Sequence, residues 1–151
     1  MSWCHQDYAI EDSRSWTETR AEAWAQGIEY DFTLIDPTQG TLLGGCGING
    51  LNHAYRFANL GYWVRSSRTR GGLATAATRF VAAFGFSELA LVRIEIVIAT
   101  GNTASQRVAE KVGATREGIL RNRLFVRDQV QNAVMFSLIP SDRIEPDIGK
   151  K

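Results

Sequence analysis

Two kinds of hydrophobic pattern follow each other along this chain. Stretches with apolar residues every three or four positions predict helices at residues 12–26, 72–88 and 102–113. Stretches that alternate, or that are dense in β-branched residues, predict strands at residues 30–35, 41–51, 58–64, 91–99, 115–123 and 131–139. The clearest apolar stripe comprises Leu73, Ala77, Phe80, Val81 and Phe84, and it predicts a helix with one buried face.

The order of these elements predicts a mixed α/β sheet of the α+β kind. The turn sequence Asp36-Pro37-Thr38-Gln39-Gly40 predicts an early hairpin. The helix at residues 72–88 lies between two strands, and such a crossover connects parallel strands. Neither a repeat nor a linker interrupts the sequence, so we expect one domain over residues 1–151.

The composition agrees with one globular domain and argues against several kinds of partner. The 151 residues are 44% hydrophobic and 22% charged, which is enough for a core. The net charge of +1 argues against a nucleic-acid binder, because such domains carry a basic excess. No apolar run approaches the roughly 20 residues that span a bilayer, and the first residues lack the features of a signal peptide. We therefore expect a cytoplasmic protein with no membrane partner.

The cysteines indicate neither a disulfide framework nor a metal site. Cys4 and Cys46 have the wrong number and spacing for a set of disulfides or for zinc. We expect both to be reduced thiols, and we expect no metal.

Positive charge gathers where a predicted strand runs into a predicted helix. Arg65, Arg68 and Arg70 stand close together without an acidic residue between them, and Gly71-Gly72 follows directly before the helix. A helix N-terminus has unpaired backbone N–H groups, its dipole favours negative charge, and glycine lets a phosphate approach the main chain. This segment therefore predicts a phosphate-binding turn.

A second glycine motif offers a competing interpretation. Residues 45–50 match the G-x-G-x-x-G pattern of dinucleotide sites. The residues that follow look like a strand end and a turn, and Arg70 stands about 20 residues further on, where a dinucleotide site has an acid. We therefore interpret residues 45–50 as a glycine-rich strand close to a ligand or to another backbone.

A series of short motifs in a fixed order resembles the GNAT acetyltransferase superfamily. The motifs are Tyr62-Trp63-Val64-Arg65, Arg68-Thr69-Arg70-Gly71-Gly72-Leu73-Ala74-Thr75, Arg93-Ile94-Glu95-Ile96, Asn102-Thr103-Ala104-Ser105, Glu110-Lys111-Val112-Gly113-Ala114 and Glu117-Gly118-Ile119-Leu120-Arg121. The resemblance covers residues 30–138 and is strongest to the RimJ/RimL-type branch, which acetylates the N-termini of ribosomal proteins. It implies the GNAT acyl-CoA N-acyltransferase fold, acetyl-CoA as the cofactor and a primary amine as the acceptor.

The resemblance also implies which residues bind the cofactor. They are Tyr62, Trp63, Val64, Arg65, Arg70, Gly71, Gly72, Leu73, Ala74, Thr75, Asn102 and Ser105. The turn at residues 70–75 would bind the pyrophosphate, and the strand at residues 62–64 would splay from its neighbour at residues 91–99 to leave backbone groups for the pantetheine arm. Ser105 would face the sulfur as the acid. Asn102 and Ser105 also have a structural interpretation, as a helix cap and a first-turn residue.

The residue that takes the proton from the acceptor's ammonium is left open by the sequence. Glu95 is the candidate catalytic base because it lies on the strand beside the splay, although Arg93 on the same face can pair with it. A water chain serves equally well. The weaker options are His53, Asp31 and Glu29.

The chain departs from the family pattern at three positions. Thr69 replaces a phosphate-loop side chain, Ala109 replaces a tyrosine acid, and Leu124 replaces a glutamate base. The missing tyrosine shifts the expected role of the acid to Ser105.

The sequence also begins late relative to the family pattern. Trp3-Cys4-His5 stands at the start, whereas the resembling proteins have a strand and a helical segment before it. We expect the fold to lack its first N-terminal strand, unless the sequence is a fragment. The loss would expose a sheet edge, which a second copy can cover, and this predicts a homodimer.

Three functions agree with the sequence. The first is acetylation of a protein or peptide N-terminus, by direct attack in a ternary complex. The second is acetylation of a small amine, such as an aminoglycoside or a polyamine. The third is a catalytically inactive GNAT-like module that binds CoA, because a fold does not guarantee a function. Acceptor choice is expected to depend on the loops at residues 4–7, 47–56 and 121–129.

Overall fold

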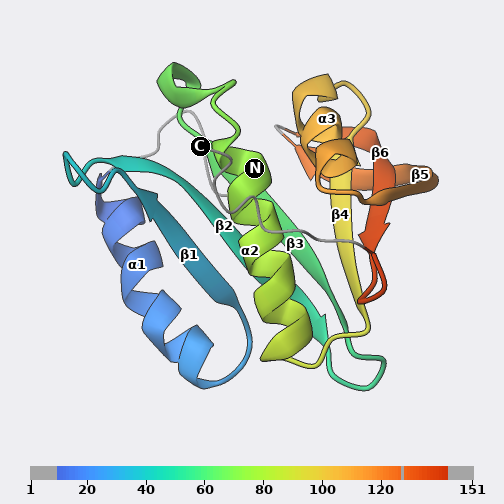
Figure 1. Ribbon diagram of the computed structural model, residues 1–151, viewed down its shortest axis with the longest axis horizontal. Coiled ribbons are helices and arrows are strands. Elements are labelled where there is room, and N and C mark those ends of the chain that lie inside the picture. Colours follow the sequence, from blue (N-terminus) through green and yellow to red (C-terminus); the bar gives the residue numbers. More distant parts are fainter. Residues whose placement is uncertain (1–9, 127, 143–151) are drawn as a thin grey trace.

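The computed structural model describes residues 10–126 and 128–142. Its helices are α1 (Ile10–Ala25), α2 (Leu73–Ser87) and α3 (Thr103–Lys111), with a short 3-10 helix η1 (Ser66–Arg68). Its strands are β1 (Tyr30–Ile35), β2 (Leu42–Asn52), β3 (Phe57–Val64), β4 (Arg93–Ala99), β5 (Thr115–Val126) and β6 (Gln129–Leu138). In this part of the chain they form one six-stranded sheet in the order β1-β2-β3-β4-β6-β5 (Figure 1). The predicted mixed α/β fold is confirmed.

Strand directions follow the connections between the elements. β3 and β4, which α2 connects, are parallel as predicted, and every other neighbouring pair is antiparallel. The strand predicted to end at residue 123 continues to Val126, because pairing with β6 resumes at Leu124 after a bulge. The expectation of a missing first strand, and the stretch Trp3-Cys4-His5, lie outside the described residues.

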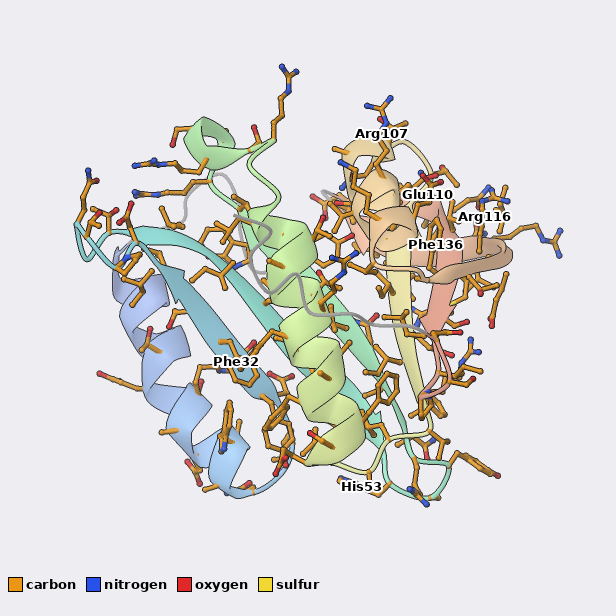
Figure 2. The ribbon with its side chains drawn as sticks, in the orientation of Figure 1. Phe32, His53, Arg107, Glu110, Arg116 and Phe136 are labelled. Carbon is orange, nitrogen blue, oxygen red and sulfur yellow. The ribbon has the colours of Figure 1, made fainter. Side chains whose placement is uncertain are left out.

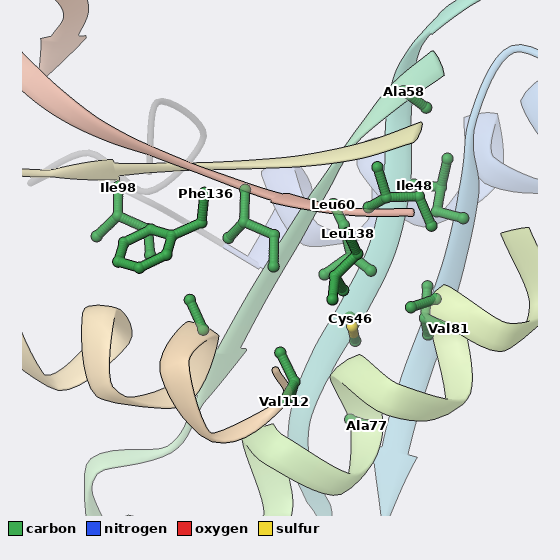
Figure 3. Packing of buried hydrophobic residues seen from close by; sticks show 14 of the residues in the cluster. Cys46, Ile48, Ala58, Leu60, Ala77, Val81, Ile98, Val112, Phe136 and Leu138 are labelled. Atoms are coloured by element: carbon green, nitrogen blue, oxygen red, sulfur yellow. The ribbon is translucent and has the colours of Figure 1, made fainter. Parts of the chain in front are cut away.

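The hydrophobic core lies between the sheet and the helices α2 and α3 (Figure 3). Its residues that are at most 2% exposed include Ile48, Leu60, Ile96 and Phe136 from the strands and Val81 and Val112 from the helices. Successive side chains of a strand point to opposite faces. The odd-numbered residues of β3 and β4 therefore point away from α2 and α3, and the second face of the sheet is available for a pocket.

Helix α1 runs beside the edge strand β1 (Figure 1). Its Trp24 ring packs edge-on against Tyr30 and Phe32, at centroid distances of 4.9 and 5.2 Å. The predicted stripe on α2 is correct for the buried Ala77 and Val81 but wrong for Phe80, which is 63% exposed. Phe80 contacts the ring of Phe32 at this edge and does not enter the core. Within the described residues, no helix is both long and apolar enough to cross a membrane.

Candidate active site

The site begins where β3 and β4 separate. They pair only from Phe57↔Arg93 to Asn59↔Glu95. On its other side β3 stays paired with β2 as far as Val64, and β4 stays paired with β6 as far as Ala99. The two strands therefore diverge beyond Asn59 and Glu95 and leave a gap between their inner edges.

Backbone groups point into this gap from both strands. The Arg65 N–H donates to the carbonyl of Leu43 at 2.9 Å, and the Thr100 N–H donates to the carbonyl of Asn132 at 3.1 Å. Because antiparallel bonds alternate between the two edges of a strand, these bonds direct the N–H and C=O groups of Tyr62 and Val64, and the C=O of Leu60, toward the gap. The Leu60 N–H is already used by the last pair of the β3–β4 ladder, Asn59↔Glu95. The same alternation directs those of Val97 toward β3. The gap thus offers hydrogen-bonding groups that a ligand can use.

The loop between β3 and α2 follows directly at the open end of the gap (Figure 1). Arg70 and Gly72 both have left-handed backbone conformations, with φ of 72° and 76°. Gly72 precedes the first turn of α2, which contains no acidic residue. The first N–H groups of a helix have no partner within the helix. A Cβ placed on Gly71 or Gly72 meets no atom within 4 Å, so the loop has free space beside these two glycines. The loop fits an anion such as the pyrophosphate of acetyl-CoA.

The arginines of this loop differ in what they contact. Arg68 lies 3.9 Å from the carboxylate of Asp36. Arg65 and Arg70 are exposed and make no ion pair with any part of the chain that the structure describes.

The backbone groups of Trp63 do not point into the gap. Its indole ring covers Gly45, where an added Cβ would come within 2.6 Å of the ring nitrogen. Gly45 therefore makes room for Trp63, and Gly47, where a Cβ would come within 2.9 Å of the Tyr30 carbonyl, lets the backbone of β1 come close, in agreement with the glycine-rich strand interpretation.

The N-terminus of α3 stands on the helix side of the gap. Asn102 caps α3, since its side-chain oxygen accepts from the Ser105 N–H at 3.1 Å. The phenol of Tyr62 on β3 donates to the Ser105 carbonyl at 2.7 Å. Burial raises the pKa of Tyr62, so this phenol stays protonated at neutral pH. A hydrogen bond thus links β3 to the first turn of α3 and fixes the position of Ser105.

A pocket of about 280 Å³ opens on the opposite face of the sheet, where the gap begins. Four strands contribute side chains to it, among them Asn49, Asn59, Glu95, Arg123 and Leu124. The amide of Asn59 donates to the amide oxygen of Asn49 at 3.0 Å. The pocket therefore combines a polar amide pair with one carboxylate and one guanidinium.

Glu95 belongs to a network of charged side chains. Arg93 Nε donates to Glu95 at 2.9 Å, and its two terminal nitrogens donate to Glu117 at 2.7 and 2.6 Å. Ser137 donates to Glu117 as well, at 2.7 Å. The hydrogen bonds from Arg93, with that from Ser137, lower the pKa of Glu117 to about 2. Glu95 is thus held in one orientation, and it still lines the pocket.

The structure separates the predicted acid from the predicted base. Ser105 lies on α3, on the core side of the sheet, whereas Glu95 points to the pocket side, and the gap lies between them. Asp31 and Glu29 pair with Arg20 beside the edge strand β1. Figure 2 shows His53 at the end of the molecule opposite the loop that precedes α2.

The substituted family positions differ in their surroundings. Ala109 is completely buried in the core, and Leu124 lines the pocket. Sequence reasoning missed Asn49 and Asn59 as pocket residues. The signal that points to them is a polar side chain in an otherwise apolar strand, since such a residue must face away from the core.

Cys46 is no candidate nucleophile. It is 3% exposed, and burial raises the pKa of its thiol to about 12. A thiol with such a pKa stays protonated and unreactive.

The chain belongs to the GNAT acetyltransferase family. The family described as "Acetyltransferase (GNAT) domain" matches residues 1–115. YdaF of Bacillus subtilis (strain 168), which carries the provisional name of a ribosomal N-acetyltransferase, is 35% identical over 100 residues; the match covers 66% of this chain and 55% of YdaF. The structure of Mycobacterium smegmatis RimJ in complex with CoA-disulfide has a TM-score of 0.81 and 31% identity, covering 87% of this chain and 63% of RimJ.

A further relative has a different acceptor in its name. Spermidine N(1)-acetyltransferase of Escherichia coli (strain K12) is 25% identical over 130 residues, which cover 80% of this chain and 70% of that enzyme. The matches span less than two thirds of the length of YdaF and of RimJ. The relatives agree on N-acetyl transfer and differ in the acceptor. The chain therefore carries the GNAT acetyltransferase domain that these N-acetyltransferases share.

Proposed function

We propose that this chain acetylates the α-amine of a protein or peptide N-terminus by direct attack in a ternary complex. One observation supports this most: the gap between β3 and β4 connects an anion-binding loop at α2 with a separate pocket on the other face of the sheet. A donor in the gap and an acceptor in the pocket can meet without a covalent enzyme intermediate. The buried, protonated Cys46 supports the same route.

We propose that the donor binds along the open edge of β3. The N–H groups at residues 72–75 contact the pyrophosphate, and the exposed Arg65 and Arg70 add charge-assisted contacts. The backbone groups of Tyr62 and Val64 bind the pantetheine arm. When bound, acetyl-CoA supplies a thioester, whose acyl carbon is open to attack by an amine.

Two side chains on opposite sides of the gap move the protons. Glu95 accepts a proton from the acceptor's ammonium, directly or through a water molecule, since only a neutral amine attacks. Ser105 donates its hydroxyl proton to the departing sulfur and takes in return the second proton of the attacking nitrogen, directly or through a water molecule, so that its hydroxyl is restored. The bond from Tyr62 to the Ser105 carbonyl supports this role, because it positions the first turn of α3.

The pocket favours a peptide amine over a polyamine. Among its described lining residues, Glu95 is the one carboxylate, and Arg93 already pairs with it. A polyamine carries several positive charges and binds best where several carboxylates meet. The amide pair of Asn49 and Asn59 suits the donors and acceptors of a peptide backbone.

The proposal is tested with acetyl-CoA and three acceptors: a peptide with a free α-amine, the same peptide with a blocked α-amine and an internal lysine, and spermidine. We expect thiol release with the free α-amine and a kcat/KM at least about tenfold lower for spermidine. Preference for spermidine would contradict the proposed acceptor. Stabilisation by acetyl-CoA without thiol release on any amine would instead indicate an inactive CoA-binding module.

The homodimer stays a prediction. Light scattering at micromolar protein concentration measures it directly, and a monomeric mass would contradict it.

A further inference from the structure

The lining of the acceptor pocket includes side chains of opposite charge. Glu95 contributes a carboxylate from β4, and Arg123 contributes a guanidinium from β5. Arg93 lies behind Glu95 but contacts two carboxylates, those of Glu95 and Glu117. This cluster of three side chains therefore keeps a net negative charge, and Arg123 faces it with a positive one.

The backbone of β5 directs Arg123 into the pocket. β6 lies between β4 and β5 in the sheet, yet the pocket takes residues from β5. The register of β5 against β6 jumps from Leu120↔Ala133 to Leu124↔Gln131, so residues 121–123 bulge out of the ladder. Bulges of this kind re-aim a side chain beside an active site.

The bulge is held in place by specific contacts. Asn122 has a left-handed backbone with φ of 51°, which asparagine adopts more readily than most residues. Its N–H donates to the side-chain oxygen of Asn132 on β6 at 2.9 Å. The backbone position of the neighbouring Arg123 at the pocket wall is therefore part of the fold.

Arg123 has no anionic partner in the described parts of the chain, 10–126 and 128–142. An arginine at the wall of a pocket, with no carboxylate of its own, is a binding group for an anion that arrives with the ligand.

We propose that Arg123 selects acceptors that carry a carboxylate close to the reacting amine. This rests on the proposed acetylation of an α-amine: the ammonium lies toward Glu95 and the carboxylate toward Arg123. Such chemistry has two sources, an acidic side chain near a peptide's N-terminus or the α-carboxylate of a free amino acid. A polyamine would instead bring a second positive charge against Arg123.

The experiment compares matched acceptors with and without the carboxylate. One pair is Ala-Glu-Ala-amide and Ala-Gln-Ala-amide, and the other is alanine and alaninamide. Initial rates of thiol release give kcat/KM for wild type, Arg123→Gln and the control Arg116→Gln. Arg116 is exposed and lies outside the pocket, on the outer β5 side of the molecule (Figure 2).

We expect wild type to prefer the acidic member of one pair by about tenfold or more, as charge-assisted hydrogen bonds typically give. Arg123→Gln removes that preference, so that the two members of the pair have equal kcat/KM, whereas Arg116→Gln keeps the preference. The pair that responds identifies the source of the carboxylate. Thermal melting of each variant confirms that it is folded.

Two results would overturn the proposal. One is equal kcat/KM for both members of both pairs in wild type, and the other is a preference that survives Arg123→Gln. Both leave the proposed α-amine acetylation intact, because transfer still occurs. Failure of that function has a different signature, namely no thiol release from any of the four amines.

Discussion

The two edges of β4 differ in how their backbone groups are used. Its outer edge pairs with β6 over six residue pairs in register, from Ile94↔Leu138 to Ala99↔Ala133. Its inner edge pairs with β3 over three and then stops. The same strand therefore holds the sheet together on one side and offers unpaired groups on the other. The proposed site is accordingly built on backbone that the fold leaves unpaired, and side chains complete it.

The largest effect is expected at the loop before α2, which is proposed to bind the pyrophosphate of the donor. Gly72→Glu puts a carboxylate onto the anion-binding loop and a Cβ onto a left-handed residue. The affinity for acetyl-CoA should fall by at least about a hundredfold, because the new charge takes the place of the phosphate. Calorimetric titration measures this. Gly118→Glu is the control on the paired β5, where a Cβ meets no atom within 4 Å. Retained affinity in Gly72→Glu would refute the loop assignment.

Ser105→Ala tests the helix side of the gap. The hydroxyl is proposed to act only in proton transfer, so kcat should fall by about 10² while the Kd for acetyl-CoA stays the same. Steady-state turnover assays give kcat, and a binding titration gives the Kd for acetyl-CoA, so the two effects are measured separately. Thr103→Ala, on an exposed residue of the same turn, controls for a general disturbance of α3. An unchanged kcat would remove Ser105 as the acid.

Tyr62→Phe tests the link across the gap with the smallest chemical change. It removes one hydrogen bond of 2.7 Å and keeps the ring. The loss of positioning should lower kcat by about five- to tenfold, as one hydrogen bond of about 1 kcal/mol predicts. Tyr55→Phe, on a residue that is 75% exposed, is the control. Equal kcat in both variants would show that the link does not position Ser105.

The smallest expected effect is a pH dependence of the free energy of unfolding, which Glu117 on the paired strand β5 causes. The pKa of Glu117 falls from 4.5 to about 2 through its bonds to Arg93 and Ser137. A carboxyl whose pKa is lower in the folded state stabilises it above pH 4.5, and this is lost as the pH falls toward 2. Because Glu117 is partly exposed, the contribution is at most about 1 kcal/mol. Urea titrations of wild type and Glu117→Gln should therefore converge below pH 3 and differ at pH 6; parallel curves would contradict this.

The elements of the fold could be predicted because their signals are local. The stripe on α2, the alternation on β1 and the many β-branched residues of β4 need only the sequence of each segment. The parallel pair followed from the crossover by α2. The bulge at residues 121–123 could not be predicted, because it depends on the register against β6 and on the bond to Asn132.

The candidate site divides in the same way. The anion-binding loop was visible in the sequence because Arg70, Gly71 and Gly72 are adjacent. The cap by Asn102 was visible because Asn102 and Ser105 are close together in the sequence. The pocket was not, since Asn49, Asn59, Glu95 and Arg123 come from four strands and meet only after folding. The face of the sheet on which Glu95 and Ser105 lie could likewise be determined only from the folded sheet.

The central claim is that the donor binds the unpaired backbone of the gap. Amide hydrogen exchange, resolved by residue and measured with and without saturating CoA, tests it directly. We predict at least about tenfold slower exchange at Tyr62, Val64 and residues 72–75, with no comparable change at the β4–β6 amides. If CoA stabilises the protein against heat but leaves these amides unprotected, the donor binds elsewhere and the claim is wrong.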